Sequence, residues 1–221
     1  MINVELIESV INNFISNGKK VFVSSSFQTH SIPLLHIISE IDRDIPIYFI
    51  ETGFHFPETI EFRESVIESM KLNVISQKSQ IPKSQQLNSE GRFYFTSDTD
   101  YCCYLNKVLP LERILINHDV WISGLRADQS VFRENLTKFD NTGFDCIKYM
   151  PLIEYTSKEL FQYKNLYDLP THPLEKYGYL SIGCEPCTHK YLSDSERSSR
   201  WHGQNKVECG MHTISDLKDK I

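Results

Sequence analysis

The sequence predicts an α/β domain, in which helices cover both faces of a mostly parallel sheet. Short apolar runs alternate with segments of helical periodicity from Val4 to Glu159. Three of the apolar runs end in polar turns, namely Ser24-Ser25-Ser26, Glu51-Thr52-Gly53 and Gly124-Leu125-Arg126. Because ligands bind outside the carboxyl ends of the strands in open α/β sheets, we expect these turns to form the binding edge.

The individual elements follow from the spacing of apolar residues. Helices are predicted over 4–15, 33–41 and 57–70, and strands over 21–23, 46–50, 72–75 and 120–123. The polar stretch 76–90 is predicted to be a loop, and helices are expected between it and residue 120. Thr156 with Glu159 has the form of a capping box that begins one more helix.

A chain of 221 residues with 40% apolar content can form one substantial core. Apolar periodicity fades after about Pro170, and the remaining residues are rich in Ser, His, Cys and charge. We therefore predict one α/β domain over 1–190, followed by an irregular, mobile C-terminal segment over 191–221.

The charge pattern excludes some partners. The net charge is -6 and no block of Lys and Arg occurs, so binding to nucleic acid is not expected. Neither a signal peptide nor an apolar stretch long enough to span a membrane is found. The expected location is the cytoplasm, where cysteines stay reduced and closely spaced ones indicate metal, cluster or thiol chemistry.

Four of the six cysteines form two close pairs. Cys102 and Cys103 are adjacent, and Cys184 and Cys187 form a CxxC. Four thiolates suit either an iron-sulfur cluster or zinc, and the adjacent pair favours the cluster because structural zinc sites normally use two spaced pairs. Cys146 stands alone in an apolar stretch and is predicted to be a core residue.

Cys209 lies near the C-terminus in Glu208-Cys209-Gly210-Met211-His212. A nucleophilic thiol must ionise, and a neighbouring cation lowers its pKa. His212 and Lys206 are the candidates by distance along the chain. Cys209 is therefore the candidate nucleophile, with an ordinary exposed cysteine as the alternative.

Several further residues are suited to bind an anion. Arg197 and Arg200 are spaced to share one face of a helical turn, and Arg126 and Arg133 follow the end of a predicted strand. The serine turn at 24–26 can bind a phosphate through amides and hydroxyls. It lacks glycine, which excludes both a Walker loop and a dinucleotide fingerprint.

Six segments carry a resemblance that covers nearly the whole chain. They are VSSSFQTH, ETGFHFPET at 51–59, CCYLNKVLPL at 102–111, SGLRADQSVFR at 123–133, GYLSIGCEPCT at 178–188, and the tail with ERSSRW and ECGMH. In this order they resemble the assimilatory sulfonucleotide reductases, the adenylyl-sulfate and phosphoadenylyl-sulfate reductases. Both cysteine pairs occupy their family positions, which points to the cluster-bearing type.

The resemblance implies an adenine nucleotide α-hydrolase-like fold and a defined chemistry. Cys209, with His212 as the second catalytic residue, would attack the sulfur of adenylyl sulfate, expel AMP and become an S-sulfocysteine. Thioredoxin or a similar dithiol would then release sulfite. The cations expected to contact sulfate and phosphate are Lys107, Arg197, Arg200 and His212. Other expected substrate contacts are Ser24, Ser25, Ser26, Thr52, Gly53, Gly124, Arg126 and Arg133, and the expected ligands of a [4Fe-4S] cluster are Cys102, Cys103, Cys184 and Cys187.

The sequence departs from the family pattern at three positions. Gln28 stands where glycine is common, Glu51 where Asp is typical, and Asn106 where Arg is frequent. The two cysteine pairs favour adenylyl sulfate as the substrate. The alternatives are a phosphoadenylyl-sulfate or dual-specificity reductase and, from a different class, a structural zinc protein. The oligomeric state is left open, a homo-oligomer included.

Overall fold

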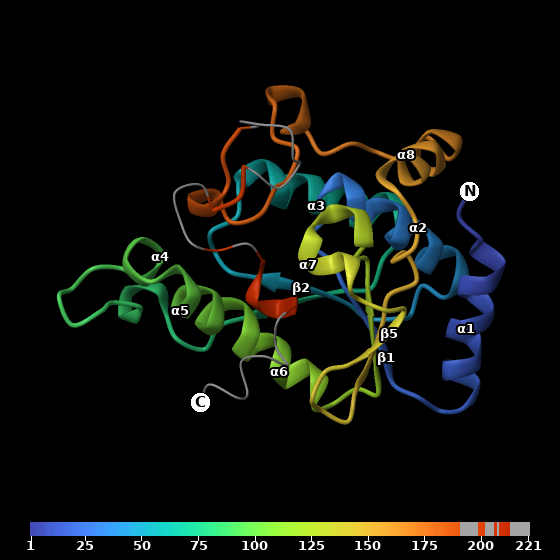
Figure 1. Cartoon of the computed structure of the whole chain (residues 1–221), viewed down its shortest axis with the longest axis horizontal. Coiled ribbons are helices and arrows are strands. Elements are labelled where there is room, and N and C mark those ends of the chain that lie inside the picture. The colour runs from blue at the N-terminus through green and yellow to red at the C-terminus, as the bar shows by residue number, and fades with distance from the viewer. Residues whose placement is uncertain (191–198, 202–205, 207, 213–221) are drawn as a thin grey trace.

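The computed structural model describes residues 1–190, 199–201, 206 and 208–212. Its centre is one twisted sheet, whose strands have the order β3-β2-β1-β4-β6-β5 (Figure 1). The bounds are β1 Val21–Ser24, β2 Ile47–Glu51, β3 Val74–Lys78, β4 Val120–Ser123, β5 Phe139–Asn141 and β6 Ile147–Tyr149. Neighbouring strands are parallel except β5 and β6, which are antiparallel.

Helices cover both faces of this sheet, as the sequence predicts. Their bounds are α1 Val4–Ser16, α2 Ile32–Ile41, α3 Pro57–Met70, α4 Tyr94–Ser97, α5 Thr99–Cys103, α6 Leu109–Leu115, α7 Val131–Glu134 and α8 Ser157–Leu166. Because side chains alternate along a strand, Val21 and Val23 pack with α1, α2, α3 and α8, whereas Phe22 packs with α6. Figure 1 shows α2, α3 and α8 above the sheet and α6 below it.

Most of the predicted elements are confirmed. The capping box of α8 is present, since Thr156 Oγ1 accepts from the Glu159 amide and the Glu159 carboxylate accepts from the Thr156 amide. The prediction for β3 was wrong in its bounds, because the strand continues to Lys78 into the expected loop. Among the described residues β3 pairs with β2 alone, and it is half exposed, so polar residues occur in it and its sequence shows no apolar pattern.

The sheet order creates a switch point between β1 and β4. The chain leaves β1 toward β2 on one side, and β4 later pairs with β1 on the other side, with Ser24 opposite Ser123. Open α/β sheets bind ligands at such a point. Within the described part of the chain, no helix combines the length and apolar composition needed to cross a membrane.

Candidate active site

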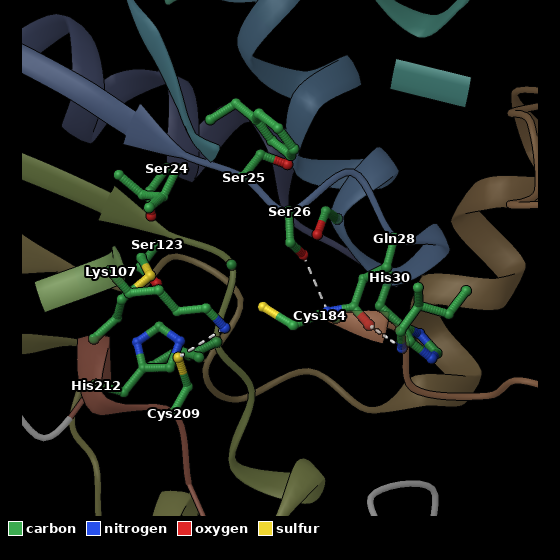
Figure 2. A pocket seen from close by; sticks show the side chains of 18 of the residues that line it. Ser24, Ser25, Ser26, Gln28, His30, Lys107, Ser123, Cys184, Cys209 and His212 are labelled. Atoms are coloured by element: carbon green, nitrogen blue, oxygen red, sulfur yellow. Dashed lines mark hydrogen bonds between the residues drawn. The ribbon is translucent and has the colours of Figure 1, made fainter. Parts of the chain in front are cut away.

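A cavity lies at the switch point, outside the carboxyl ends of β1, β2 and β4 (Figure 2). It brings together residues that the sequence places far apart. Those already predicted as site residues are Ser24, Ser25, Ser26, Lys107, Gly124, Arg133, Cys184, Arg200, Cys209 and His212. Arg197 falls outside the described residues.

The serine turn forms one wall of the cavity and is fixed by three side-chain hydrogen bonds. Ser25 Oγ accepts from the Phe27 amide at 3.1 Å, and Gln28 Nε2 donates to Ser26 Oγ at 3.1 Å. Trp121 Nε1 donates to Ser24 Oγ at 2.7 Å. Phe27 holds φ +55, a conformation that a non-glycine residue rarely adopts, and its side chain is fully buried. The turn is therefore held in place by contacts outside its own backbone.

Gln28 links the turn to the cysteine-bearing segment. Its Oε1 accepts from the Ile182 amide at 3.3 Å, two residues before Cys184. The sequence identifies Gln28 only as a departure from the family pattern, because a contact across 154 residues leaves no local signal. The side chain takes a connecting role that a glycine cannot supply.

Lys107 is presented to the cavity by a break in helical geometry. α5 is followed without interruption by a π-helical segment, Tyr104–Val108, and then by α6. Such segments are rare and often occur at functional sites. The break places Lys107 Nζ at 3.8 Å from Cys209 Sγ, and Figure 2 shows the two side chains pointing toward each other.

The charges at this contact favour a thiolate. Burial alone would raise the pKa of Cys209, but the Lys107 ammonium reverses that effect, and the pKa is lowered. Burial would likewise lower the pKa of Lys107, yet negative charge on the neighbouring sulfur atoms, those of Cys184 and Cys209 first, raises it. The arrangement suits a nucleophilic sulfur beside a permanent cation.

The residues after Cys209 pack against the domain. The Gly210–His212 turn follows it directly, and a Cβ placed on Gly210 would lie only 3.1 Å from a Val108 methyl group. The His212 ring stacks on Trp121, with centroids 6.1 Å apart. Lys206, the other cation near Cys209 in sequence, pairs with Asp100 of α5.

Arg200 reaches the cavity from a short ribbon. The pair Thr188 and Arg200 forms an antiparallel bridge, and the Trp201 amide donates to the Cys187 carbonyl at 3.1 Å. Arg200 Nε donates to the same carbonyl at 3.2 Å, and the guanidinium lies 4.6 Å from the Trp201 ring centroid. Gly183 faces the guanidinium so closely that any Cβ there would overlap it.

The four paired cysteines line a second, smaller cavity beside the first. Its wall is made of Thr52, Phe54, Phe95, Thr99, Cys102, Cys103, Asn106, Lys107, Cys184, Pro186 and Cys187. Thr52 Oγ1 lies 3.4 Å from Cys184 Sγ, and Asn106 Nδ2 lies 3.6 Å from Cys102 Sγ. All four cysteines are free of disulfides.

The chemistry of these four thiols suits a metal group that is bound through thiolates. Burial raises the pKa of Cys102 to about 11 and that of Cys103 to about 12, so without a metal they stay neutral. A bound metal group deprotonates such thiols, and the donors on Thr52 and Asn106 can hydrogen-bond to the sulfur ligands. Among the described residues, no three His, Cys, Asp or Glu side chains lie closely enough to hold a single metal ion.

Three predicted substrate contacts do not line the main cavity. Arg126 is fully buried, where Nε donates to Asp128 at 2.9 Å and Nη2 donates to Ser157 at 2.5 Å, so it ties the end of β4 to the start of α8. Thr52 lines the cysteine cavity instead. Gly53, at φ +71, accepts a hydrogen bond from Lys83 through its carbonyl.

Two residues that touch the site were not predicted as site residues. Trp121 joins Ser24 and His212, but an apolar strand residue gives no indication of such a role. His55 lines the main cavity, and burial lowers its pKa to about 4, with Lys107 acting in the same direction. His55 lies within ETGFHFPET, so the family motif includes its position but does not indicate its role.

The parallel sheet and its structural neighbours define an adenine nucleotide α-hydrolase-like fold class. FMN adenylyltransferase from Candida glabrata superposes with a TM-score of 0.59 at 15% identity, covering 98% of this chain and 80% of that one. The NAD synthetase from Campylobacter jejuni gives 0.55 at 11% identity, covering 80% and 76%. Within this class, the chain belongs to the phosphoadenosine phosphosulfate reductase domain family, whose model matches residues 20–190.

Named relatives agree with this family. The adenosine 5'-phosphosulfate reductase 1 of Bacillus subtilis is 39% identical over 199 residues, which cover 88% of this chain and 85% of that protein. Its counterpart in Bacillus cytotoxicus is 40% identical over 199 residues, covering 87% and 84%. A phosphoadenylyl-sulfate reductase structure from Candida auris has a TM-score of 0.68 at 21% identity, covering 80% and 87%. The resemblance seen in the motifs is thus confirmed for the family, while the cluster-bearing type stays a prediction.

Proposed function

We propose that this protein reduces adenylyl sulfate to sulfite and AMP in assimilatory sulfate reduction, with thioredoxin or a similar dithiol as the reductant. Relatives named adenosine 5'-phosphosulfate reductase support the substrate. The observation that carries the proposal is the contact of 3.8 Å between Lys107 Nζ and Cys209 Sγ at the edge of a nucleotide-type cavity. The proposed location is the cytoplasm.

In the first half-reaction, the Cys209 thiolate attacks the sulfur of the bound sulfate group. An S–S bond forms, the S–O bond to the phosphate breaks, and its electron pair leaves with AMP. Lys107, Arg200 and His212 line the same cavity, and their positive charge or hydrogen bonding favours the anion and the charge that moves to the leaving group. The product is S-sulfocysteine at Cys209.

In the second half-reaction, a dithiol regenerates the cysteine. One of its thiolates attacks Cys209 Sγ, and sulfite leaves with the electron pair of the broken S–S bond. The second thiol then resolves the mixed disulfide and frees the Cys209 thiolate. Two electrons have passed from the dithiol, which becomes a disulfide, to the sulfate sulfur.

The second cavity is proposed to hold a [4Fe-4S] cluster through Cys102, Cys103, Cys184 and Cys187. When bound, the cluster would supply a fixed charge beside Lys107. This chain's own part is to bury the four thiols together and to offer Thr52 and Asn106 as hydrogen-bond donors. Lys107 lines both cavities and so connects this site with the proposed sulfonucleotide site.

The proposal is tested by weighing the intact protein after incubation with adenylyl sulfate in the absence of any dithiol. One added sulfonate should appear, should map to Cys209, and should disappear as sulfite when thioredoxin is added. Cys209→Ser should keep nucleotide binding but form no adduct. An adduct on another cysteine, or sulfite release by Cys209→Ser, contradicts the mechanism.

The same assay measures substrate preference. We expect a higher kcat/KM for adenylyl sulfate than for its 3'-phosphorylated form. Equal values would indicate dual specificity and reversed values a phosphoadenylyl-sulfate reductase. Neither result affects the assignment of Cys209.

A further inference from the structure

Arg133 and Glu208 form a buried ion pair that joins α7 to the Cys209 segment, residues 208–212. Arg133 Nε donates to Glu208 Oε2 at 2.8 Å, and Nη2 donates to Oε1 at 2.9 Å. The two side chains are only 4% and 2% exposed. Two parallel charge-assisted hydrogen bonds of this kind fix both the distance and the orientation of the partners.

The pair occupies two of the three guanidinium nitrogens of Arg133. Besides the two bonds to Glu208, Arg133 Nη1 donates to Gln129 Oε1. Arg133 is expected from its motif to bind the substrate anion, yet in this geometry its three nitrogens are bonded within the protein. The carboxylate of Glu208 holds the place that an external oxoanion would take on Arg133.

Glu208 also fixes the backbone of the cysteine that follows it. Its Oε1 accepts from the Cys209 amide at 2.8 Å, in addition to the bond from Arg133. One carboxylate oxygen thus connects the guanidinium of α7 to the amide of Cys209. The thiol of Cys209 is then directed at Lys107, 3.8 Å away.

Breaking such a pair is costly, because the remaining charge stays buried without its partner. Lys148 is a second buried cation in this region, and its Nζ lies 4.8 Å from the centroid of the Trp121 ring. Its pKa is lowered to about 8, first by burial and also by the charge of Arg133. The carboxylate of Glu208 offsets the positive charge of Arg133 and Lys148. Undocking of residues 208–212 would remove this carboxylate from the two buried cations.

We propose that Glu208 and Arg133 are positioning residues that hold Cys209 in place for its attack on the sulfate. This inference rests on the proposed function. The pair acts only in the first half-reaction, because Cys209 lines the main cavity while residues 208–212 are held by the pair. A second protein must bring a thiol into bonding distance of Cys209 Sγ, which requires the segment to leave the cavity. Loss of the pair should therefore slow sulfonation and leave the release of sulfite by thioredoxin unimpaired.

The test compares Glu208→Gln with the exchanged variant Arg133→Glu/Glu208→Arg. Glu90→Gln is the matched control, because it removes the same charge from an ion pair with Arg92 in which both side chains are exposed, Glu90 by 61% and Arg92 by 67%, where ion pairs contribute little. Three rates are measured on the full chain: single-turnover formation of the Cys209 adduct, release of sulfite from the preformed adduct by thioredoxin, and alkylation of Cys209 by iodoacetamide without nucleotide.

Glu208→Gln should slow adduct formation about tenfold or more, the factor equivalent to 1.4 kcal/mol, and should leave the thioredoxin step as fast as in the wild type. Alkylation should become faster even at a pH at which Cys209 is fully ionised, because the segment undocks more often; the loss of the Glu208 charge, which raises the pKa of Cys209, speeds alkylation only below that pH. The exchanged variant should recover part of the wild-type protection, although an arginine beside Cys209 would by itself speed alkylation. Glu90→Gln should match the wild type in all three rates.

Two results overturn the inference. The first is that Glu208→Gln is alkylated and forms the adduct at the wild-type rates. The second is that Glu208→Gln slows both half-reactions equally. Alkylation needs no substrate, so it reports on docking even if the proposed function fails. If the wild type forms no adduct with adenylyl sulfate, the function is wrong, and the alkylation rates still decide whether the ion pair docks the segment.

Discussion

Lys107 Nζ lies 3.8 Å from Cys209 Sγ, although 102 residues separate them in the sequence. Lys107 is placed by a π-helical segment and Cys209 by a segment that packs across it. The contact therefore brings residues from two separate parts of the chain together for one reaction step, the formation of the Cys209 adduct.

Replacing Lys107 by Met, which keeps the length of the side chain but not its charge, should slow adduct formation at Cys209 by about 10²- to 10³-fold, as for the loss of one donor to developing charge. The rate is measured from the mass of the protein in single-turnover reactions that are quenched at successive times. Lys107→Arg, which keeps the charge, should retain part of the rate. A Met variant that sulfonates at the wild-type rate would show that the contact is not used.

The four cysteines of the smaller cavity should all be needed for iron. Serine at Cys102, Cys103, Cys184 or Cys187 should lower the iron content and the absorbance of protein purified without oxygen, because a cluster rarely survives the loss of one thiolate. Cys146→Ser is the control, since Cys146 is equally buried but packs among apolar residues on α6's side of the sheet. Iron loss in that variant, or zinc in place of iron in the wild type, contradicts the proposed cluster.

Gly183 should be required because of Arg200. A methyl group at Gly183 overlaps the guanidinium, so Gly183→Ala should displace it and weaken sulfonucleotide binding by about 1.5 to 3 kcal/mol, the value for one charge-assisted hydrogen bond. KM should rise more than kcat falls. Arg200→Ala should have a similar effect, and the double variant should be little worse than either single one.

Gly178→Ala separates this clash from backbone strain. Gly178 holds φ +88, and no atom lies within 4 Å of the position that a methyl group would take there, so alanine should lower stability without changing KM. Equal KM values for the two alanine variants would mean that Gly183 does not set the position of Arg200.

The sequence predicts elements better where burial imposes a pattern. The apolar runs at 21–23 and 120–123 match β1 and β4 to within one residue, because both strands are central and buried. β3 was displaced because an edge strand tolerates Ser76 and Gln77. The motifs locate most cavity residues, but the pairing of Arg133 with Glu208 is tertiary, and no local propensity encodes it.

His172 gives a prediction for stability against pH. Its side chain is 1% exposed, the Leu174 amide donates to Nδ1 at 3.2 Å, and Nε2 lies 3.0 Å from Thr59 Oγ1. With Nδ1 accepting, the proton must sit on Nε2, so a second proton would face the Leu174 amide. Burial lowers the pKa of His172 to about 4 from 6.5, and Glu58 opposes this only in part.

Because the folded pKa lies below the unfolded value, the unfolded chain binds a proton first as the pH falls. The contribution of His172 is complete above about pH 6.5 and is lost progressively down to about pH 4, by up to roughly 3 kcal/mol. His172→Asn keeps an acceptor for Leu174 but cannot be protonated. Urea unfolding at about pH 7.5 and about pH 5 should show a smaller loss of unfolding free energy in this variant than in the wild type. The same loss in both proteins would mean that other groups, such as paired carboxylates, account for the acid sensitivity.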